Sequence, residues 1–150
     1  MLSLQEISDR LEIADVMVRY SHAVDTHQWD LLDELFTADA HIDYTAMGGP
    51  AGDLASTKQF LASVMPNFTA FQHLVSNSSI RVDGDSATAR TMCHNPMVVD
   101  GADGHQRLML CGLWYLDSFT RVAGVWRISR RVEEKSYMFV APPADAVVSS

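Results

Sequence analysis

The chain has 150 residues, of which 47% are hydrophobic and 20% charged, a balance typical of a globular protein that predicts one domain over residues 1–150. The formal net charge of −8 and the lack of a basic stripe exclude nucleic acid as an expected partner. The sequence contains no run of about 18 apolar residues, so no membrane-spanning segment is predicted. Cys93 and Cys111 lie in apolar strand-like runs without a secretory signal, so we expect reduced thiols and a cytoplasmic location.

An N-terminal helix is predicted to begin after Ser3, because Ser3 and Glu6 form a capping-box pattern. Steps of three and four residues define the stripe that we expect to face the core, which comprises Leu4, Ile7, Leu11, Ala14, Val18 and Ser21. The same steps lead to Asp25. A carboxylate at the end of an apolar stripe is a candidate site residue, although it can equally be the turn acid for a second helix.

The next three elements are shorter. The sequence HQWDLLDELF, residues 27–36, predicts a second helix capped by Thr26, with a buried face that comprises Trp29, Leu32, Leu35 and Phe36. AHIDYTAM, residues 40–47, predicts a short strand with one face formed by Ile42 and Tyr44 and the other by His41 and Asp43. A third helix is expected over residues 56–65, where Pro66 ends it.

From residue 69 onward the pattern changes to long strands. Turn signals at VDGDS, DGADG and RVAGVW divide this part into four strands, near residues 69–82, 85–99, 105–119 and 124–138. Helices followed by hairpin-connected strands predict an α+β fold, in which a strongly curved, mainly antiparallel sheet wraps around about three N-terminal helices. Apolar residues on both faces of the last two strands predict a homo-oligomer that buries the outer face.

A histidine, His73, stands among apolar residues in the stretch TAFQHLVSN. If Asp83 and Gly84 form a two-residue hairpin turn, His73 pairs with His94 on the next strand. Directly opposed residues project from the same face with Cβ atoms about 5 Å apart, so both imidazoles are expected in one pocket. A three-residue turn or a bulge would break this register.

Each of these residues also has a structural interpretation. A half-buried histidine is more often a hydrogen-bonded structural residue than a catalyst, Tyr44 can pack in the core with its hydroxyl at the rim, and Cys111 can be a small core residue. No phosphate loop or nucleophile motif is present, and no recognised metal-ligand spacing is found among His22, His27, His41 and Asp43. We therefore expect neither a metal nor a cofactor.

Five segments together resemble the SnoaL-like branch of the nuclear-transport-factor-two-like superfamily, and within it the scytalone dehydratases and hexachlorocyclohexane dehydrochlorinases. The segments are SHAVDTHQWDLLDELF, AHIDY, FQHLV, MCHNP and CGLWYLDSFTRVAGVWRISR. The resemblance extends from about residue 3 to residue 140. It implies a cone-shaped α+β barrel with a pocket at its open end, commonly assembled as a trimer or dimer through the outer face of the sheet.

The resemblance also implies site residues. Asp25 and His73 match the carboxylate–histidine pair of these enzymes, and Tyr44 and His94 match two further pocket residues of the dehydratases. The chain departs from the dehydratase pattern at two positions, because Val24 stands where a tyrosine is found and Cys111 where an asparagine is found. The expected pocket is therefore more apolar, with substrate contacts from Tyr20, Val24, Phe71 and Cys111.

Taken together, these residues predict a cofactor-independent lyase of the dehydratase type that acts on a small, hydroxylated, cyclic or aromatic-precursor ketone. His73 is the expected base and Asp25 orients it, while Tyr44 stabilises the enolate oxygen. His94 is expected to protonate the departing hydroxyl. Three alternatives remain at this point: an isomerase or polyketide-type cyclase, a non-catalytic ligand-binding or assembly module such as the β subunit of ring-hydroxylating dioxygenases, and a small transport or storage barrel.

Overall fold

The structure, a computed structural model, describes residues 1–142. Its helices are α1 (Leu4–Asp25), α2 (Leu32–Leu35) and α3 (Leu54–Val64), with short 3-10 turns at Trp29–Leu31, Thr45–Met47 and Met65–Asn67. Its strands are β1 (Phe36–Asp43), β2 (Ala51–Gly52), β3 (Phe68–Phe71), β4 (Leu74–Asp83), β5 (Ser86–Asp100), β6 (Gln106–Val122) and β7 (Val125–Val140). Among the described residues, no helix combines the length and the apolar character needed to cross a membrane.

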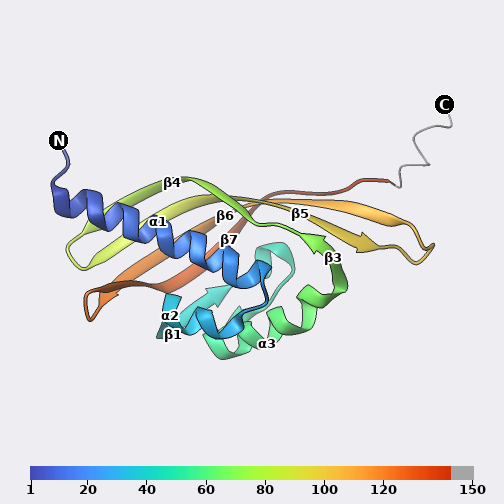
Figure 1. The fold of residues 1–150 in the computed structure, drawn as a ribbon, viewed down its shortest axis with the longest axis horizontal. Helices are drawn as coiled ribbons and strands as arrows, with labels where there is room; N and C mark the ends of the chain where they lie inside the picture. Colours follow the sequence, from blue (N-terminus) through green and yellow to red (C-terminus); the bar gives the residue numbers. More distant parts are fainter. Residues whose placement is uncertain (143–150) are drawn as a thin grey trace.

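The seven strands form one open, mixed sheet in the order β2-β1-β7-β6-β5-β3, with β4 also paired to β5. All pairings are antiparallel except that of β1 with β7. Figure 1 shows α1 lying across the long strands and α2 and α3 grouped with β1, while the hairpin of β5 and β6 extends well beyond the helices. The predicted α+β class is confirmed; β5 has the expected length, and β6 and β7 are slightly longer than expected.

The first helix begins where the sequence predicts, because the Ser3 hydroxyl accepts a hydrogen bond from the Glu6 backbone N–H at 3.1 Å. The predicted inward stripe is wrong. Its large apolar members Leu4, Ile7, Leu11 and Val18 are exposed, and of the predicted stripe only Ser21 is buried. The buried face comprises Asp9, Ile13, Val16, Met17, Tyr20, Ser21, Ala23 and Val24. Asp9 is tolerated there because Arg121 and Trp126 donate hydrogen bonds to it, at 2.7 and 3.2 Å.

Two helix starts also differ from the prediction. The second helix is reduced to one 3-10 turn and α2, and Thr26 instead ends α1, where its hydroxyl donates to the backbone carbonyl of His22 at 2.6 Å. The third helix begins two residues earlier than expected. Its cap is Asp53, whose carboxylate accepts from the Ser56 backbone N–H at 2.8 Å and so satisfies an unpaired donor of the first turn.

The β4–β5 hairpin decides which side chains of both strands point inward. Its loop is formed by Gly84 and Asp85, so that Asp83 pairs with Ser86 and the register is displaced by two residues from the predicted one. A further shift of one residue occurs at a bulge around Asn77, whose φ is +48°. A shift of one residue in the pairing exchanges the inner and outer faces of a strand. Residues of β4 that precede the bulge therefore point to the opposite face from the one that the register at the turn would give them.

Candidate active site

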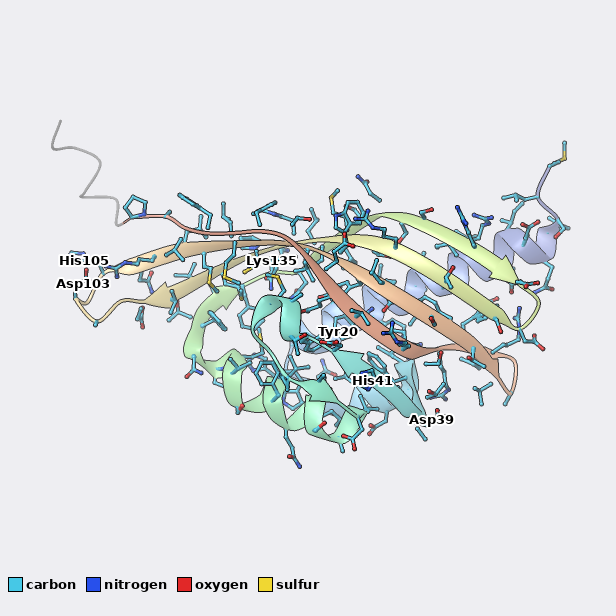
Figure 2. All side chains as sticks on the ribbon, turned by 180° about the vertical axis from the view of Figure 1, so that it is seen from behind. Tyr20, Asp39, His41, Asp103, His105 and Lys135 are labelled. Carbon is cyan, nitrogen blue, oxygen red and sulfur yellow. The ribbon has the colours of Figure 1, made fainter. Side chains whose placement is uncertain are left out.

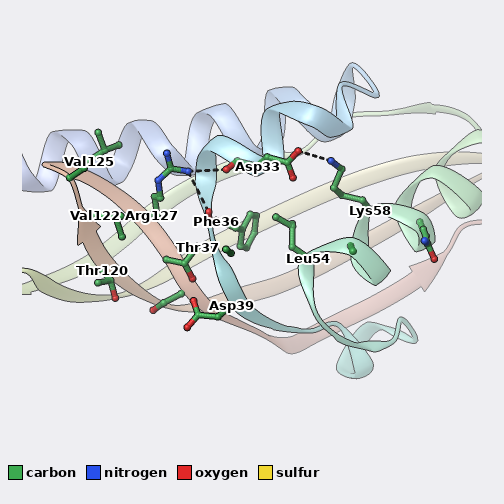
Figure 3. Close-up of a pocket in the computed structure, with 15 residues that line it drawn as sticks. Asp33, Phe36, Thr37, Asp39, Leu54, Lys58, Thr120, Val122, Val125 and Arg127 are labelled. Carbon is green, nitrogen blue, oxygen red and sulfur yellow. Dashed lines mark hydrogen bonds and ion pairs between the residues drawn. The ribbon is translucent and has the colours of Figure 1, made fainter.

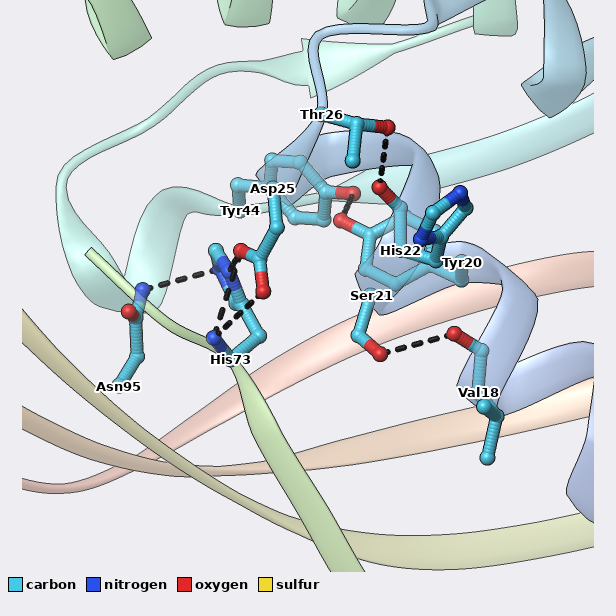
Figure 4. A network of polar contacts seen from close by, with 9 residues as sticks. All are labelled: Val18, Tyr20, Ser21, His22, Asp25, Thr26, Tyr44, His73 and Asn95. Atoms are coloured by element: carbon cyan, nitrogen blue, oxygen red, sulfur yellow. Dashed lines mark hydrogen bonds and ion pairs between the residues drawn. The ribbon is translucent and has the colours of Figure 1, made fainter. Parts of the chain in front are cut away.

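The C-terminal end of α1 meets the segment between β3 and β4 through a carboxylate–imidazole pair (Figure 4). Asp25 Oδ1 lies 2.6 Å from His73 Nδ1, and Asp25 Oδ2 accepts the backbone N–H of His73 at 3.0 Å. The side chain of His73 is 8% exposed and that of Asp25 is 23% exposed. Two hydrogen bonds to one carboxylate hold the ring in a single orientation and place the Nδ1 proton toward Asp25.

The other ring nitrogen of His73 contacts Asn95, which the sequence analysis did not single out. Asn95 Nδ2 lies 2.9 Å from His73 Nε2 and donates to it, an arrangement that matches a neutral imidazole protonated on Nδ1. Asn95 Oδ1 is buried and has no hydrogen-bond partner among the described residues. The sequence did contain a signal for Asn95. It lies two residues from Cys93 and two from Met97, so all three side chains share the buried face of β5.

The prediction that His73 and His94 share a pocket is wrong. His94 pairs with Leu74, and its ring lies on the outer face of the sheet, where Nδ1 is 2.7 Å from the hydroxyl of Tyr137. The bulge at Asn77 is the physical reason, since it changes the parity of the register between the turn and His73. Asn95 therefore occupies the inward position that the sequence analysis gave to His94.

A cavity of about 160 Å³ lies between the helices and the inner face of the sheet. Its polar lining comes from His73, Asn95, Tyr20, Tyr44, Tyr115, Cys111 and Glu133, and most of the remainder is Met, Leu, Val and Phe side chains. Figure 2 shows Tyr20 enclosed by the helices and the sheet, far from Asp103 and His105 at the tip of the β5–β6 hairpin. An engineered apolar cavity of about 150 Å³ holds one benzene molecule, so this space suits a single ring.

Two tyrosine hydroxyls meet at the cavity wall. The oxygen atoms of Tyr20 and Tyr44 are 2.5 Å apart, and both side chains are buried. Burial raises the pKa of both hydroxyls, so both keep their protons at neutral pH. Because one hydroxyl donates to the other, the pair has one O–H left to donate to a ligand oxygen.

The other residues expected to contact substrate fall into two groups. Cys111 lines the cavity, as Tyr20 does. Val24 is 1% exposed within the core and Phe71 is half-buried with its ring stacked 5.6 Å from that of His27; neither is among the residues that line the cavity. Burial raises the pKa of the Cys111 thiol, which keeps it a neutral, weakly polar part of the wall.

Two charged residues of β7 belong to the site and were missed from the sequence. Arg131 is fully buried beside the rings of Tyr20 and Tyr115, with its guanidinium carbon 4.0 and 4.1 Å from their centroids. Its Nε and Nη2 donate to the carboxylate of Asp117 at 2.8 and 2.9 Å. Glu133, two residues further along β7, lines the cavity. The run RRVEEK resembles a solvated face in sequence, so no pattern distinguished these two residues.

A larger groove of about 1080 Å³ lies elsewhere, between β1, α3 and the β6–β7 hairpin (Figure 3). Both of its cationic side chains already have partners: Lys58 is 2.8 Å from Asp33, and Arg127 donates to the backbone carbonyl of Asp33 at 2.8 Å. The carboxylate–imidazole pair is not part of it. We therefore place the candidate active site in the smaller cavity.

Comparison with known proteins shows the family and the fold of this chain. The sequence model of the SnoaL-like domain matches residues 5–132. An uncharacterized protein of Mycobacterium tuberculosis strain H37Rv is 50% identical over 137 residues, which cover 91% of this chain and 92% of that protein.

Two solved structures share the fold at low sequence identity. A provisionally named scytalone dehydratase from Novosphingobium aromaticivorans has a TM-score of 0.77 at 22% identity, covering 92% of this chain and 94% of its own. A hexachlorocyclohexane dehydrochlorinase of type 3 from Novosphingobium barchaimii has a TM-score of 0.74 at 20% identity, covering 93% and 99%. The predicted resemblance is confirmed.

Proposed function

This chain belongs to the SnoaL-like domain family, and we propose that it is a lyase that removes water from a small hydroxylated cyclic ketone, with His73 as the general base. The contact of 2.6 Å between Asp25 and His73, at the wall of a cavity of about 160 Å³, carries this proposal. A site that only bound an apolar ligand would gain nothing from a partly desolvated carboxylate, because desolvation of a charge costs free energy. The pair therefore favours catalysis over a passive binding module.

The proton transfer follows from the tautomer. Nδ1 of His73 carries the proton that faces Asp25, so Nε2 has the lone pair that accepts a proton from a carbon atom next to the substrate carbonyl. The Asp25 carboxylate then stabilises the positive charge that forms on the ring. Asn95 holds Nε2 in the resting state and must release it when the substrate enters.

The negative charge that develops on the substrate carbonyl oxygen needs a hydrogen-bond donor, and the paired hydroxyls of Tyr20 and Tyr44 supply one. Both tyrosines line the cavity, so their free O–H can donate to a ligand oxygen there. A donor that is already in place lowers the barrier most. Both hydroxyls stay neutral because burial raises the pKa of each. This arrangement supports the role proposed for Tyr44 and adds Tyr20 as its partner.

The cavity sets the size of the substrate. About 160 Å³ accommodates one six-membered ring with small substituents, and its wall is mostly apolar. A two-ring substrate would require the cavity to widen, and a charged one would lose hydration against the mostly apolar wall. We therefore expect a neutral, single-ring hydroxyketone whose elimination gives a conjugated enone and water, chemistry that requires no cofactor.

The test uses 3-hydroxycyclohexanone and related single-ring hydroxyketones, with the enone product followed by its ultraviolet absorbance. His73→Ala should abolish turnover while affinity for the unreactive ring cyclohexanone persists. Asp25→Asn should lower turnover by roughly 10²- to 10⁴-fold, because an amide N–H facing Nδ1 forces the ring proton onto Nε2. His41→Ala removes an exposed histidine outside the cavity and should have no effect.

The double variant distinguishes a catalytic unit from two independent contacts. If Asp25 acts only through His73, the double variant should be no slower than His73→Ala alone. A structural pair would behave differently, because both single variants would lower the melting temperature and weaken cyclohexanone binding. That outcome, with no specific loss of turnover, would refute the proposal, and exchange of substrate α-protons without release of water would indicate an isomerase instead.

A further inference from the structure

Glu133 extends from β7 into the same cavity as His73 and has no role in the steps above. It lies opposite Tyr115 of β6, whose side chain is 2% exposed. Its Oε2 atom is enclosed by protein and has no hydrogen-bond partner among the residues described. A buried carboxyl oxygen without a partner costs free energy, so its presence at the cavity wall calls for an explanation.

Burial favours the protonated form of Glu133, and the charges around it do not outweigh this effect: Arg131 lowers the pKa of the carboxyl, whereas Asp43 raises it. The titratable and charged groups near it come from five elements, from the end of β1 and from the segment that carries His73. They are Tyr20, Asp43, Tyr44, Cys93, Cys111, Tyr115, Arg131 and His73. Only Arg131 brings a permanent positive charge, and Asp117 already pairs with it through two hydrogen bonds. Burial is the largest effect and raises the pKa of Glu133 to about 8.

An elimination needs a proton donor for the leaving group, and the outward-facing His94 cannot supply it. A carboxyl that is neutral at pH 7 and lines the same single-ring cavity as the base meets this need. The two groups reach the cavity from different elements, His73 from the β3–β4 segment and Glu133 from β7. Because both line one cavity of about 160 Å³, we expect a single ring to contact both.

We propose that Glu133 is the general acid of this site, an inference that rests on the proposed lyase function. As His73 Nε2 takes the α-proton, the electron pair of the C–H bond forms the double bond and the C–O bond breaks. The departing oxygen takes the Glu133 proton and leaves as water. The site then holds a Glu133 carboxylate and a His73 imidazolium, and transfer of the proton from the ring to the carboxylate restores both groups.

The experiment separates this step from the action of the base. Cyclohexanone in D₂O reports α-proton exchange, which needs only the base, while 3-hydroxycyclohexanone reports loss of water, which needs both groups. Glu133→Gln should leave exchange unchanged and slow elimination by roughly 10²- to 10⁴-fold. The fall of wild-type turnover above about pH 8 should disappear in this variant. Glu134→Gln is the matched control, since Glu134 is exposed and paired with Arg90 at 2.6 Å.

A second measurement needs no turnover. In protein labelled with ¹³C at the glutamate carboxyls, the resonance that is missing from Glu133→Gln should titrate with a midpoint near pH 8. Titration at the ordinary value of a glutamate would overturn the assignment, as would unchanged elimination in Glu133→Gln. Wild-type protein that neither exchanges protons nor eliminates water would instead refute the proposed function, and this inference with it.

Discussion

Replacement of Glu133 by glutamine should change how the stability of the protein depends on pH. The folded protein holds this carboxyl at a pKa of about 8, against 4.5 for an ordinary glutamate. Between these two values the folded state binds the proton and the unfolded state does not, so wild-type stability falls as pH rises. Glutamine keeps the shape of the side chain and carries no charge in either state, and the variant should lack this fall.

The magnitude follows from the shift. The pKa of Glu133 differs by about 3.5 units between the folded and unfolded states, and each unit corresponds to about 1.4 kcal/mol. The free energy of unfolding of the wild type, measured against that of Glu133→Gln, should therefore fall by about 5 kcal/mol between pH 4 and pH 9. The difference between the two proteins should be constant below pH 4.5, should change through the window from 4.5 to 8, and should be constant again above it. All other titrating groups are the same in the two proteins, so their contributions cancel in this difference.

Urea unfolding at half-unit intervals from pH 4 to pH 9 measures this difference directly, with Glu134→Gln as the control that should follow the wild type. A difference between wild type and Glu133→Gln that does not vary with pH would refute the argument. It would mean that Glu133 is ionised in the folded protein and that burial does not dominate its environment.

Two further predictions concern parts of the molecule outside the dyad. Asp117→Ala should lower the free energy of unfolding by about 3–5 kcal/mol, because it leaves the fully buried Arg131 without its counter-charge. Urea unfolding measures this loss. Replacement of both Asp117 and Arg131 by apolar residues should recover much of the lost stability. The outer face of the sheet should form a homo-oligomer interface, since it exposes a group of apolar side chains that includes Leu74, Leu108, Tyr137 and Phe139. Light scattering should give a mass above the 16.6 kDa of one chain, and a monomer at micromolar concentration would contradict this.

The sequence predicted the fold well where a local signal has one physical meaning. Ser3 followed by Glu6 can only be satisfied at a helix start, and the structure has the hydrogen bond. The apolar faces of α1 were harder, because that helix carries two apolar stripes. The stripe with fewer polar residues is exposed, and the one with Asp9 is buried because distant residues on β6 and β7 donate hydrogen bonds to it. Such partners lie more than 100 positions away and leave no local trace.

The candidate site was predictable to the extent that it did not depend on register. Asp25 and His73 come from two elements that the fold brings together, and their contact does not require a particular strand pairing. Whether position 94 or 95 points inward does require it. One left-handed residue, Asn77, shifts the pairing by one and exchanges the two faces, and a serine-rich and asparagine-rich strand offers little apolar alternation to reveal that shift.

Two carboxyl groups of this site have opposite surroundings, and this difference supports the roles proposed for them. Asp25 accepts a backbone N–H and lies against a ring N–H, contacts that stabilise a carboxylate. The Oε2 atom of Glu133 has no such donor among the described residues, and burial holds that side chain in its neutral form. Acid and base functions in one pocket require groups whose protonation states differ at the same pH. A carboxylate that stabilises the base and a carboxylic acid that supplies the leaving-group proton satisfy that requirement without a cofactor.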